Sequence, residues 1–207
     1  AGGTAAGGAG GGTRAGGAAA ADDGLQDMRM TAQRSPVAKL PENHRTRVKA
    51  LWAVPMRQNS DKLVKHKSVE ILVENLKTLS GCFLLDDQII NLYRILCQER
   101  SDSNVAFPNV WIARTNMYNK IKSEGPDSVS RWTKSVDGGV FAKDLVIFPI
   151  NINGGHWVCG VVNMKKPRFE LYDSAPNSET KTQVFTNLSQ WLQAEATAKN
   201  IKLDLKM

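Results

Sequence analysis

Residues 144–174 read DLVIFPININGGHWVCGVVNMKKPRFELYDS, and the pattern in this stretch is the strongest indication of the fold. Runs of Val, Ile, Phe and Leu that are broken by Pro, Asn, Gly and Lys are typical of short strands joined by turns. Strands connected so closely favour antiparallel pairing. The predicted strands are 144–150, 156–162 and 168–172, with turns at 151–155 and 164–167.

Two amphipathic helices are expected beside these strands. In Asp86–Gln98 the apolar residues recur at i, i+1, i+4, i+7 and i+8, which is one face of a 3.6-residue period. Asp86 and Asp87 stand at its start, where carboxylates favour the helix dipole. Its expected inward residues are Ile89, Ile90, Tyr93, Leu96 and Cys97. The second helix spans Asn177–Lys199, with Val184, Phe185, Leu188, Trp191 and Leu192 expected inward.

Shorter elements complete a domain over residues 61–207. Val64–Val73 is predicted to be a strand, or a strand plus a turn, and Glu74–Leu79 a helical turn. Residues 101–140 are polar and are expected to be loops around one or two short helices. Ile201–Lys206 alternates apolar and polar residues, which predicts a final strand. The expected fold class is α/β (α+β), with a mixed or antiparallel central sheet flanked by helices.

The N-terminal part has a different composition. Residues 1–21 contain nine Gly, nine Ala, two Thr and one Arg, so residues 1–24 are expected to be a disordered low-complexity tail. Residues 25–60 are expected to be a basic linker. The net charge of the chain is +7, and much of the basic excess lies between Arg34 and Arg57.

This basic segment has several possible roles. Such charge can contact nucleic acid, an acidic partner or an import receptor. A solvated linker is the simpler interpretation, and Trp52 is the only aromatic residue there for base stacking. Nucleic acid is therefore not the expected partner.

Composition also limits the compartment. Three cysteines without a secretory signal indicate a reducing compartment. The longest apolar run, 145–150, is too short to span a membrane. The sequence suggests no cofactor and no metal site.

The candidate chemistry lies in the hairpin between His156 and Asp173. A turn centred between Met164 and Lys165 places His156 directly opposite Asp173, and opposed residues of an antiparallel pair share a face. In such a pair the Asp orients the His, which then polarises a thiol or hydroxyl. A one-residue shift of the turn centre moves this pairing by two residues.

A surface His that merely lies near a surface Asp is the plain alternative. Two neighbouring features favour a site instead. Gly154 and Gly155 allow backbone or substrate to approach closely. Trp157 adds a large flat side chain beside the pair.

The quoted segments resemble the catalytic domain of the ubiquitin-like-protein-specific cysteine proteases, the SUMO (sentrin) proteases. The resemblance rests on 144–151, 155–158 and 169–174, and on Leu85-Asp86-Asp87-Gln88-Ile89-Ile90-Asn91-Leu92-Tyr93. It covers roughly residues 61–207. It implies a papain-like fold with a circularly permuted His, Asp, Cys order.

The resemblance also implies residue roles. His156 would be the general base and Asp173 its orienter. Trp157 would pack on the Gly-Gly tail of a ubiquitin-like modifier, in a channel that only glycines are thin enough to enter. Asp87 would pair with a basic residue of the modifier; helix N-terminal charge is the plain alternative, and the two roles are compatible. Leu84 stands where the family has a second channel Trp.

The nucleophile is expected outside this sequence. In the family it lies beyond the Asp, together with an oxyanion-hole Gln, and no Cys follows Asp173 before Met207. Strand alternation turns Cys159 away from His156, and Cys97 is expected in the core. Cys82 precedes a helix and is an alternative nucleophile. It lies several residues before the expected N-cap, which argues against it.

Three functions follow. The first is a cysteine isopeptidase that removes or matures a SUMO-like modifier; without its nucleophile, the chain as given would be inactive. The second is a non-catalytic module that binds ubiquitin-like proteins. The third is nucleic-acid contact through 34–57. The family and the basic linker suggest nuclear or nucleocytoplasmic localisation.

Overall fold

The computed structural model describes residues 39–54, 61–81 and 83–203. The chain divides into two compact units, Ala1–Arg45 and Thr46–Met207. The expected disordered tail, 1–24, lies outside the described residues. Within the expected linker, residues 42–53 form helix α2 (Glu42–Ala53), which buries none of its side chains and was not predicted.

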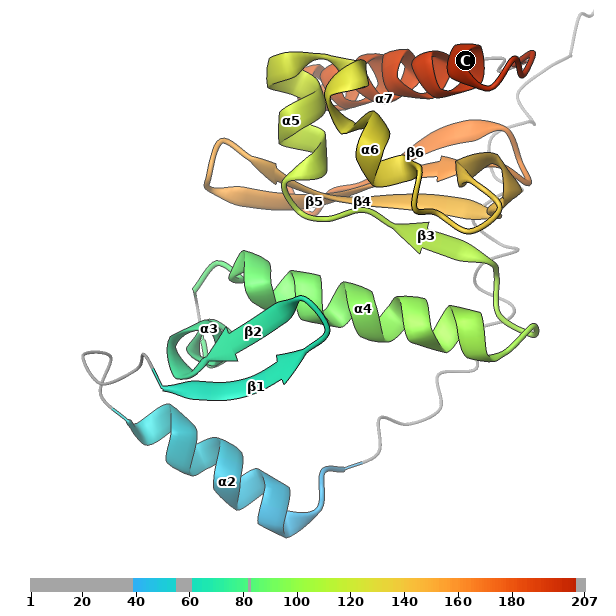
Figure 1. Cartoon of the computed structure of the whole chain (residues 1–207). Coiled ribbons are helices and arrows are strands. Elements are labelled where there is room, and N and C mark those ends of the chain that lie inside the picture. The colour runs from blue at the N-terminus through green and yellow to red at the C-terminus, as the bar shows by residue number, and fades with distance from the viewer. Residues whose placement is uncertain (1–38, 55–60, 82, 204–207) are drawn as a thin grey trace, which may run out of the picture. The chain divides into compact units, whose positions relative to one another are not determined.

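A four-stranded mixed sheet forms the centre of the second unit (Figure 1). Its order is β3-β4-β5-β6, with β3 parallel to β4 and the other pairs antiparallel. The mixed sheet confirms the predicted fold class. The strands are β3 (Val110–Ile112), β4 (Leu145–Ile152), β5 (His156–Asn163) and β6 (Arg168–Tyr172). Only β3 was missed, because three residues are too few to establish a period.

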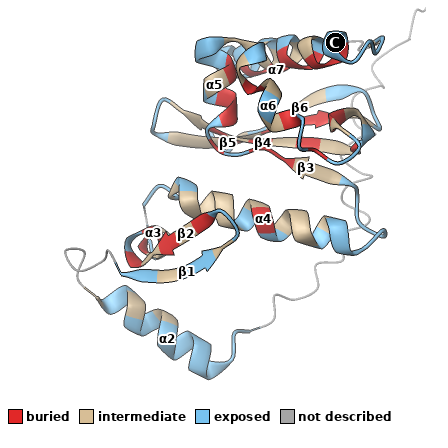
Figure 2. Ribbon diagram, in the orientation of Figure 1, coloured by how far each residue is buried: buried red, intermediate tan, exposed pale blue. Residues whose placement is uncertain are grey.

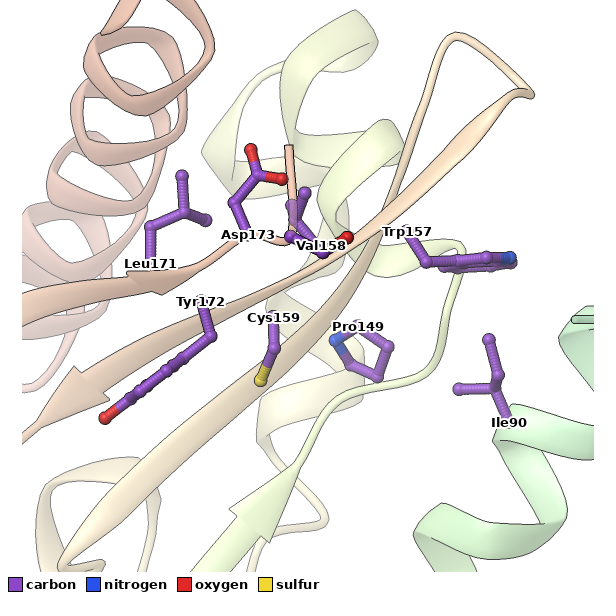
Figure 3. Close-up of a pocket in the computed structure, with 9 residues that line it drawn as sticks. Ile90, Pro149, Trp157, Val158, Cys159, Leu171, Tyr172 and Asp173 are labelled. Carbon is purple, nitrogen blue, oxygen red and sulfur yellow. The ribbon is translucent and has the colours of Figure 1, made fainter. Parts of the chain in front are cut away.

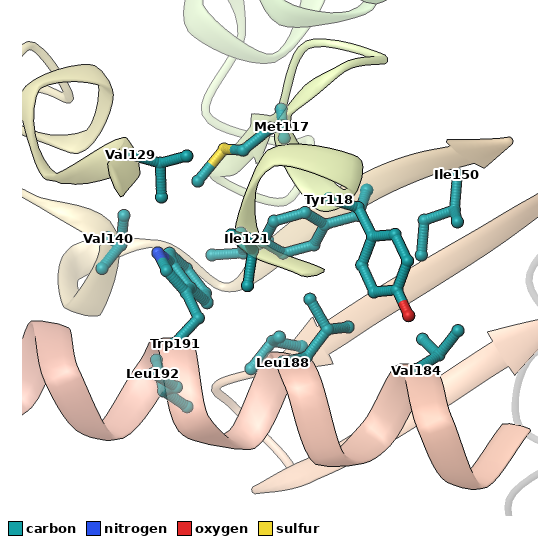
Figure 4. Packing of buried hydrophobic residues seen from close by; sticks show 14 of the residues in the cluster. Met117, Tyr118, Ile121, Val129, Val140, Ile150, Val184, Leu188, Trp191 and Leu192 are labelled. Atoms are coloured by element: carbon teal, nitrogen blue, oxygen red, sulfur yellow. The ribbon is translucent and has the colours of Figure 1, made fainter. Parts of the chain in front are cut away.

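Helices α5 (Met117–Glu124) and α7 (Ser178–Ala198) lie on the same side of this sheet (Figure 1). Figure 4 shows their side chains meeting in the main core, and Figure 2 shows the buried residues gathered there. Trp191 packs edge-on against Phe148 with ring centroids 5.0 Å apart. The inward face predicted for α7 is confirmed, since Val184, Leu188, Trp191 and Leu192 are buried and Phe185 packs against the cluster.

A smaller hydrophobic core lies between β2 (Val69–Leu72) and α4 (Asp87–Ser103). Its buried residues are Val69, Ile71 and Ile95, with Ile89 and Leu92 packed against them. The predicted strand plus turn is a hairpin, and the predicted helical turn is present. The hairpin consists of β1 (Lys62–His66) and β2, and the helical turn is α3 (Val73–Lys77).

The predicted inward face of α4 is partly wrong. Tyr93 is 69% exposed and Leu96 47% exposed. The apolar residues of α4 spread over more than one face, so the period alone admits two orientations. The helix instead buries Ile95 against β2, and Ile89 and Leu92 pack beside it.

Polar side chains of α4 cap the free edge of β3. Gln98 donates to the Val110 carbonyl at 2.8 Å and accepts from the Ile112 amide at 3.3 Å. Arg94 donates to the Ile112 carbonyl at 3.3 Å. Buried backbone groups need such partners, so these bonds tie α4 to the sheet.

The remaining described segments are short. Residues 101–140 include η2 (Pro126–Val129), α6 (Ser130–Thr133) and η3 (Val140–Ala142), with α5 and β3. Residues 201–203 are irregular, so that part of the predicted final strand is wrong, and 204–206 lie outside the described residues. In the part of the chain that the structure describes, no helix has the length and apolar character needed to cross a membrane.

Candidate active site

His156 is the first residue of β5 and follows a tight turn from β4. Asn153 and Gly154 have φ values of +53° and +75°, and the Gly155 amide donates to the Ile152 carbonyl at 3.0 Å. A positive φ is adopted readily by Gly and tolerated by Asn, which explains this turn sequence. The turn pairs Ile152 with His156 and so places the imidazole at the end of the sheet.

Asp173 directly follows β6 and binds the imidazole. Its Oδ1 accepts a hydrogen bond from His156 Nε2 at 2.6 Å and a second from the Ala175 amide at 2.8 Å. The Asp173 side chain is 5% exposed, against 33% for His156. The structure therefore brings the two predicted residues together, with the carboxylate buried and the ring open to a reactant.

The predicted register of this hairpin is wrong by two residues. Asn163 pairs with Arg168 and Cys159 with Tyr172, so the turn is centred between Lys165 and Lys166. Continuing this register places Asp173 level with Val158 and diagonal to His156. The contact persists because a shift of two residues keeps the same face, and diagonal neighbours remain within reach of long side chains.

The hydrogen bond fixes the chemistry of the ring. An ionised carboxylate only accepts hydrogen bonds, so Nε2 carries the proton and Nδ1 keeps its lone pair. Among the described residues, no group hydrogen-bonds to Nδ1. The imidazole is thus oriented to take a proton from a thiol or hydroxyl.

Asp173 stays ionised over a wide pH range. The hydrogen bond from His156, and then the Ala175 amide, hold the pKa of this carboxyl below its ordinary value of 3.8. A carboxylate that is charged throughout the neutral range stabilises the imidazolium that forms after proton transfer.

Trp157 follows His156 in β5, so its side chain points to the opposite face of the strand. It lines an open cavity of about 620 Å³ (Figure 3). Its indole Nε1 donates to the Leu85 carbonyl at 2.8 Å. Trp157, Cys159 and Asp173 line the cavity, and Ile90 of α4 adds a wall from a distant part of the chain. The indole is therefore held in one orientation at the mouth of an apolar cavity.

The two other predicted substrate-binding residues lie at the start of α4. Leu84 is 51% exposed in the segment that precedes the helix. Asp86 is the N-cap, since its side chain accepts from the Gln88 amide, and exposed Asp87 is the first helical residue. Among the described residues Asp87 forms no ion pair, so its carboxylate is open to a partner.

The described cysteines are poorly placed to attack. Cys159 is half-buried on the face opposite His156, and burial raises the pKa of its thiol. It also lines the cavity, so it is only partly buried. Cys97 lies on α4 beside Tyr93, whose pKa it raises through charge repulsion. The alternative nucleophile, Cys82, lies outside the described residues.

Sequence reasoning missed the backbone groups of the site. The Leu85 carbonyl and the Ala175 amide hold Trp157 and Asp173, but a main-chain group leaves no signal in residue type. Ile90 was predicted inward and in fact faces the cavity. Within residues 39–54, 61–81 and 83–203, no group of three His, Cys, Asp or Glu side chains lies close enough to hold a metal ion.

The chain resembles known proteins over this same region. The family described as the Ulp1 protease family, C-terminal catalytic domain, matches residues 84–205. A sentrin-specific protease of Caenorhabditis elegans is 32% identical over 189 residues, which cover 86% of this chain and 26% of that protein. Sentrin-specific protease 3 of Homo sapiens is 31% identical over 137 residues, covering 66% and 22%. The chain thus spans about a quarter of the length of these relatives.

Solved structures share the fold. The C-terminal Ulp1 protease domain in complex with Smt3, the yeast ortholog of SUMO, has a TM-score of 0.64 and 24% identity, covering 83% of this chain and 74% of that one. The SUMO protease Ulp1 with its catalytic cysteine oxidised to a sulfenic acid has a TM-score of 0.66 and 25% identity, covering 82% and 73%.

Proposed function

The chain belongs to the Ulp1 protease family, and we propose that its site is the His–Asp part of a cysteine isopeptidase. The observation that carries the proposal is the 2.6 Å bond between His156 Nε2 and the buried Asp173 carboxylate. The His156 side chain is 33% exposed, and the next residue, Trp157, lines an open cavity from the other face of β5. An oriented base one residue away from an indole that lines a cavity suits attack on a thin peptide tail.

The proposed substrate is a SUMO-like modifier joined through its C-terminal Gly-Gly. A flat indole packs against a chain that lacks side chains, and larger residues would be excluded from the channel. Exposed Asp87 would pair with a basic residue of the modifier. The relatives named above support this substrate class, since they are sentrin-specific proteases.

The proposed reaction has two steps. His156 Nδ1 takes the thiol proton, and the thiolate attacks the carbonyl carbon of the terminal Gly. The C–N bond breaks as the imidazolium returns its proton to the leaving amine. Water then hydrolyses the thioester with His156 again as base, which releases the carboxylate and regenerates the thiol.

We further propose that the thiol comes from a cysteine that follows Met207 in the complete protein. Cys159 faces away from His156, and Cys97 lies on α4 beside Tyr93. The curated relatives are much longer than this chain, which leaves room for such a segment. The 207-residue chain alone would then be inactive.

Capture by SUMO with a C-terminal vinyl electrophile tests this proposal. The 207-residue chain should form no adduct, and the chain extended to its natural C-terminus should form one at a cysteine beyond Met207. His156→Ala in the extended chain should slow capture, while Asp137→Asn, an exposed loop change, should not.

Two outcomes would redirect the proposal. An adduct on the 207-residue chain that Cys82→Ala abolishes would make Cys82 the nucleophile. A natural C-terminal extension without a cysteine would rule out the isopeptidase. It would leave the second candidate, a module that binds ubiquitin-like proteins through Trp157 and Asp87.

Localisation is a separate proposal. Arg45, Arg47 and Lys49 are exposed on α2, where an import receptor or an acidic partner can reach them. We expect nuclear or nucleocytoplasmic fluorescence from a tagged chain, and loss of the nuclear fraction when the three are changed to Gln. An unchanged distribution of fluorescence would show that α2 does not direct import.

Nucleic-acid contact through 34–57 has a separate test. Binding of RNA or DNA that does not weaken with salt, or no binding at all, would exclude this contact.

A further inference from the structure

The peptide group between Leu85 and Asp86 has hydrogen-bond partners at both ends. Its carbonyl oxygen accepts from Trp157 Nε1 at 2.8 Å. Its N–H donates to Thr78 Oγ1 at 3.1 Å. Because a peptide group is planar and rigid, fixing the N–H also fixes the direction of the carbonyl.

Thr78 is itself firmly held. Its hydroxyl donates to the Asn75 carbonyl at 2.7 Å, and its amide donates to the same oxygen at 3.2 Å. The Asn75 side chain in turn accepts from the Leu72 amide at 2.7 Å and is buried. Both hydrogen-bonding roles of the Thr78 hydroxyl are therefore used.

These bonds form one continuous chain. It runs from Asn75 through Thr78 and the 85–86 peptide to the indole of Trp157. Hydrogen bonds in series polarise one another, so the loss of one weakens the next. This series of hydrogen bonds connects α3 to Trp157, the residue that follows His156. Leu85 and Trp157 are 72 positions apart in the sequence.

We propose that Thr78 is a positioning residue of the tail channel. It acts through the 85–86 peptide to set the plane of the Trp157 indole, and it touches neither the substrate nor His156. The inference rests on the proposed function, because it assigns to Trp157 the wall against which a Gly-Gly tail packs. Exposed Leu84 immediately precedes this peptide, so the same restraint also limits where Leu84 lies.

The test uses the 207-residue chain with Thr78→Val, which keeps the shape and removes the hydroxyl. Thr78→Ser keeps the hydroxyl and should restore the wild-type behaviour. Thr182→Val is the matched control, because Thr182 Oγ1 also bonds a nearby carbonyl, at 3.0 Å, but on the exposed side of α7.

The first readout is the ¹⁵N–¹H resonance of the Trp157 indole, assigned among the five tryptophans with Trp157→Phe. In Thr78→Val this resonance should move and its proton should exchange faster with solvent, while the Trp191 resonance stays in place. The second readout is the affinity for a peptide that ends in Gly-Gly, which should weaken roughly 2- to 10-fold, the value of one hydrogen bond.

The outcomes separate this inference from the proposed function. A folded Thr78→Val chain with an unmoved Trp157 resonance and unchanged peptide affinity would overturn the role of Thr78. Equal shifts of all five indoles would overturn it too, because they would indicate general destabilisation. If Thr78→Val fails to fold, the rate at which the wild-type Trp157 indole proton exchanges with solvent is the test. Trp52 is 41% exposed, and exchange at Trp157 as fast as at Trp52 would show that Trp157 does not donate to the Leu85 carbonyl. A wild-type chain that binds no Gly-Gly peptide would contradict the proposed function instead.

Discussion

Asp173 shows how a single carboxylate can define the site. It accepts from His156 and from the Ala175 amide, and its side chain is almost fully buried. Those two bonds favour its charged form and keep its pKa low. The same bonds select which nitrogen of His156 is free to act as a base.

Replacing Asp173 with Asn should give a pH-dependent loss of stability. A carboxyl whose pKa is lowered by folding stabilises the folded state above its ordinary value of 3.8, and this contribution is lost as pH falls through the lowered value. The difference in free energy of unfolding between wild type and Asp173→Asn should therefore be constant at neutral pH and shrink below about pH 4.

Urea unfolding at several pH values between 3 and 7 measures this difference. Asp137→Asn serves as the control, because Asp137 is an exposed loop residue, and its difference from wild type should stay small throughout. A wild-type advantage over Asp173→Asn that grows on acidification would contradict the stated role of the carboxylate.

Leu84 offers a gain-of-binding test. Its side chain is 51% exposed, so a larger ring fits without displacing the core. Leu84→Trp should tighten binding of a Gly-Gly peptide by roughly 2- to 10-fold, because an added aromatic face contributes about 0.5–1.5 kcal/mol. Phe83→Trp is the control, since Phe83 is 61% exposed next to it. Equal tightening by both changes would indicate nonspecific contact.

Residue types predicted the His156–Asp173 contact but not the groups that support it. Alternation along two strands was enough to place both residues on one face, even with the register shifted by two. The Leu85 carbonyl and the Ala175 amide belong to the main chain, so their partners depend on the tertiary fold. They are invisible in a list of side chains.

At the scale of elements, α4 performs three tasks along adjoining stripes of its surface. Ile95 packs against β2, Gln98 and Arg94 cap the edge of β3, and Ile90 lines the cavity. A helix with one buried stripe would have matched the predicted face. The apolar period favoured the stripe that holds Tyr93 and Leu96, and it did not show that another stripe, with Ile95, packs against β2.

Gln98→Ala tests the edge-capping task. It removes two hydrogen bonds to β3 and leaves the Val110 carbonyl and the Ile112 amide without them. We expect a loss of about 1–3 kcal/mol in the free energy of unfolding. Gln193→Ala, on the exposed side of α7, should change it by no more than about 0.5 kcal/mol. Similar losses for both would show that the bonds to β3 add nothing.

Gly160 tests the packing of α7 on the sheet. A Cβ at this position would lie 3.0 Å from Ile150 Cδ1 and 3.3 Å from Leu188 Cδ1. Gly160→Ala should lower the free energy of unfolding by about 1–3 kcal/mol, because a well-packed core resists added volume. Gly81→Ala adds the same methyl where no atom lies within 4 Å and should not destabilise the chain. Thermal unfolding of the two variants measures this difference. A Gly160→Ala chain as stable as the wild type would contradict close packing at this position.

At the scale of the whole molecule, the site joins segments that are distant in sequence. The hairpin supplies His156, Trp157 and Asp173, while the segment just before α4 supplies Leu84 and the Leu85 carbonyl that holds the indole. Hydrophobic patterns predicted most of the strands and α7, because each depends on local periodicity. The packing of α4 and the preceding segment against the hairpin depends on tertiary contacts. Only the resemblance to a family predicted that these two parts of the sequence form one site.

Titration of the 207-residue chain with intact SUMO tests whether a Gly-Gly tail binds beside Trp157. The ¹⁵N–¹H spectrum should show saturable shifts at the Trp157 indole and the His156 ring. Both should disappear when the terminal Gly-Gly is deleted from SUMO or when Trp157 is changed to Ala. Equal affinity for SUMO with and without its Gly-Gly, or shifts confined to residues away from β5 and the start of α4, would contradict a tail channel at this site.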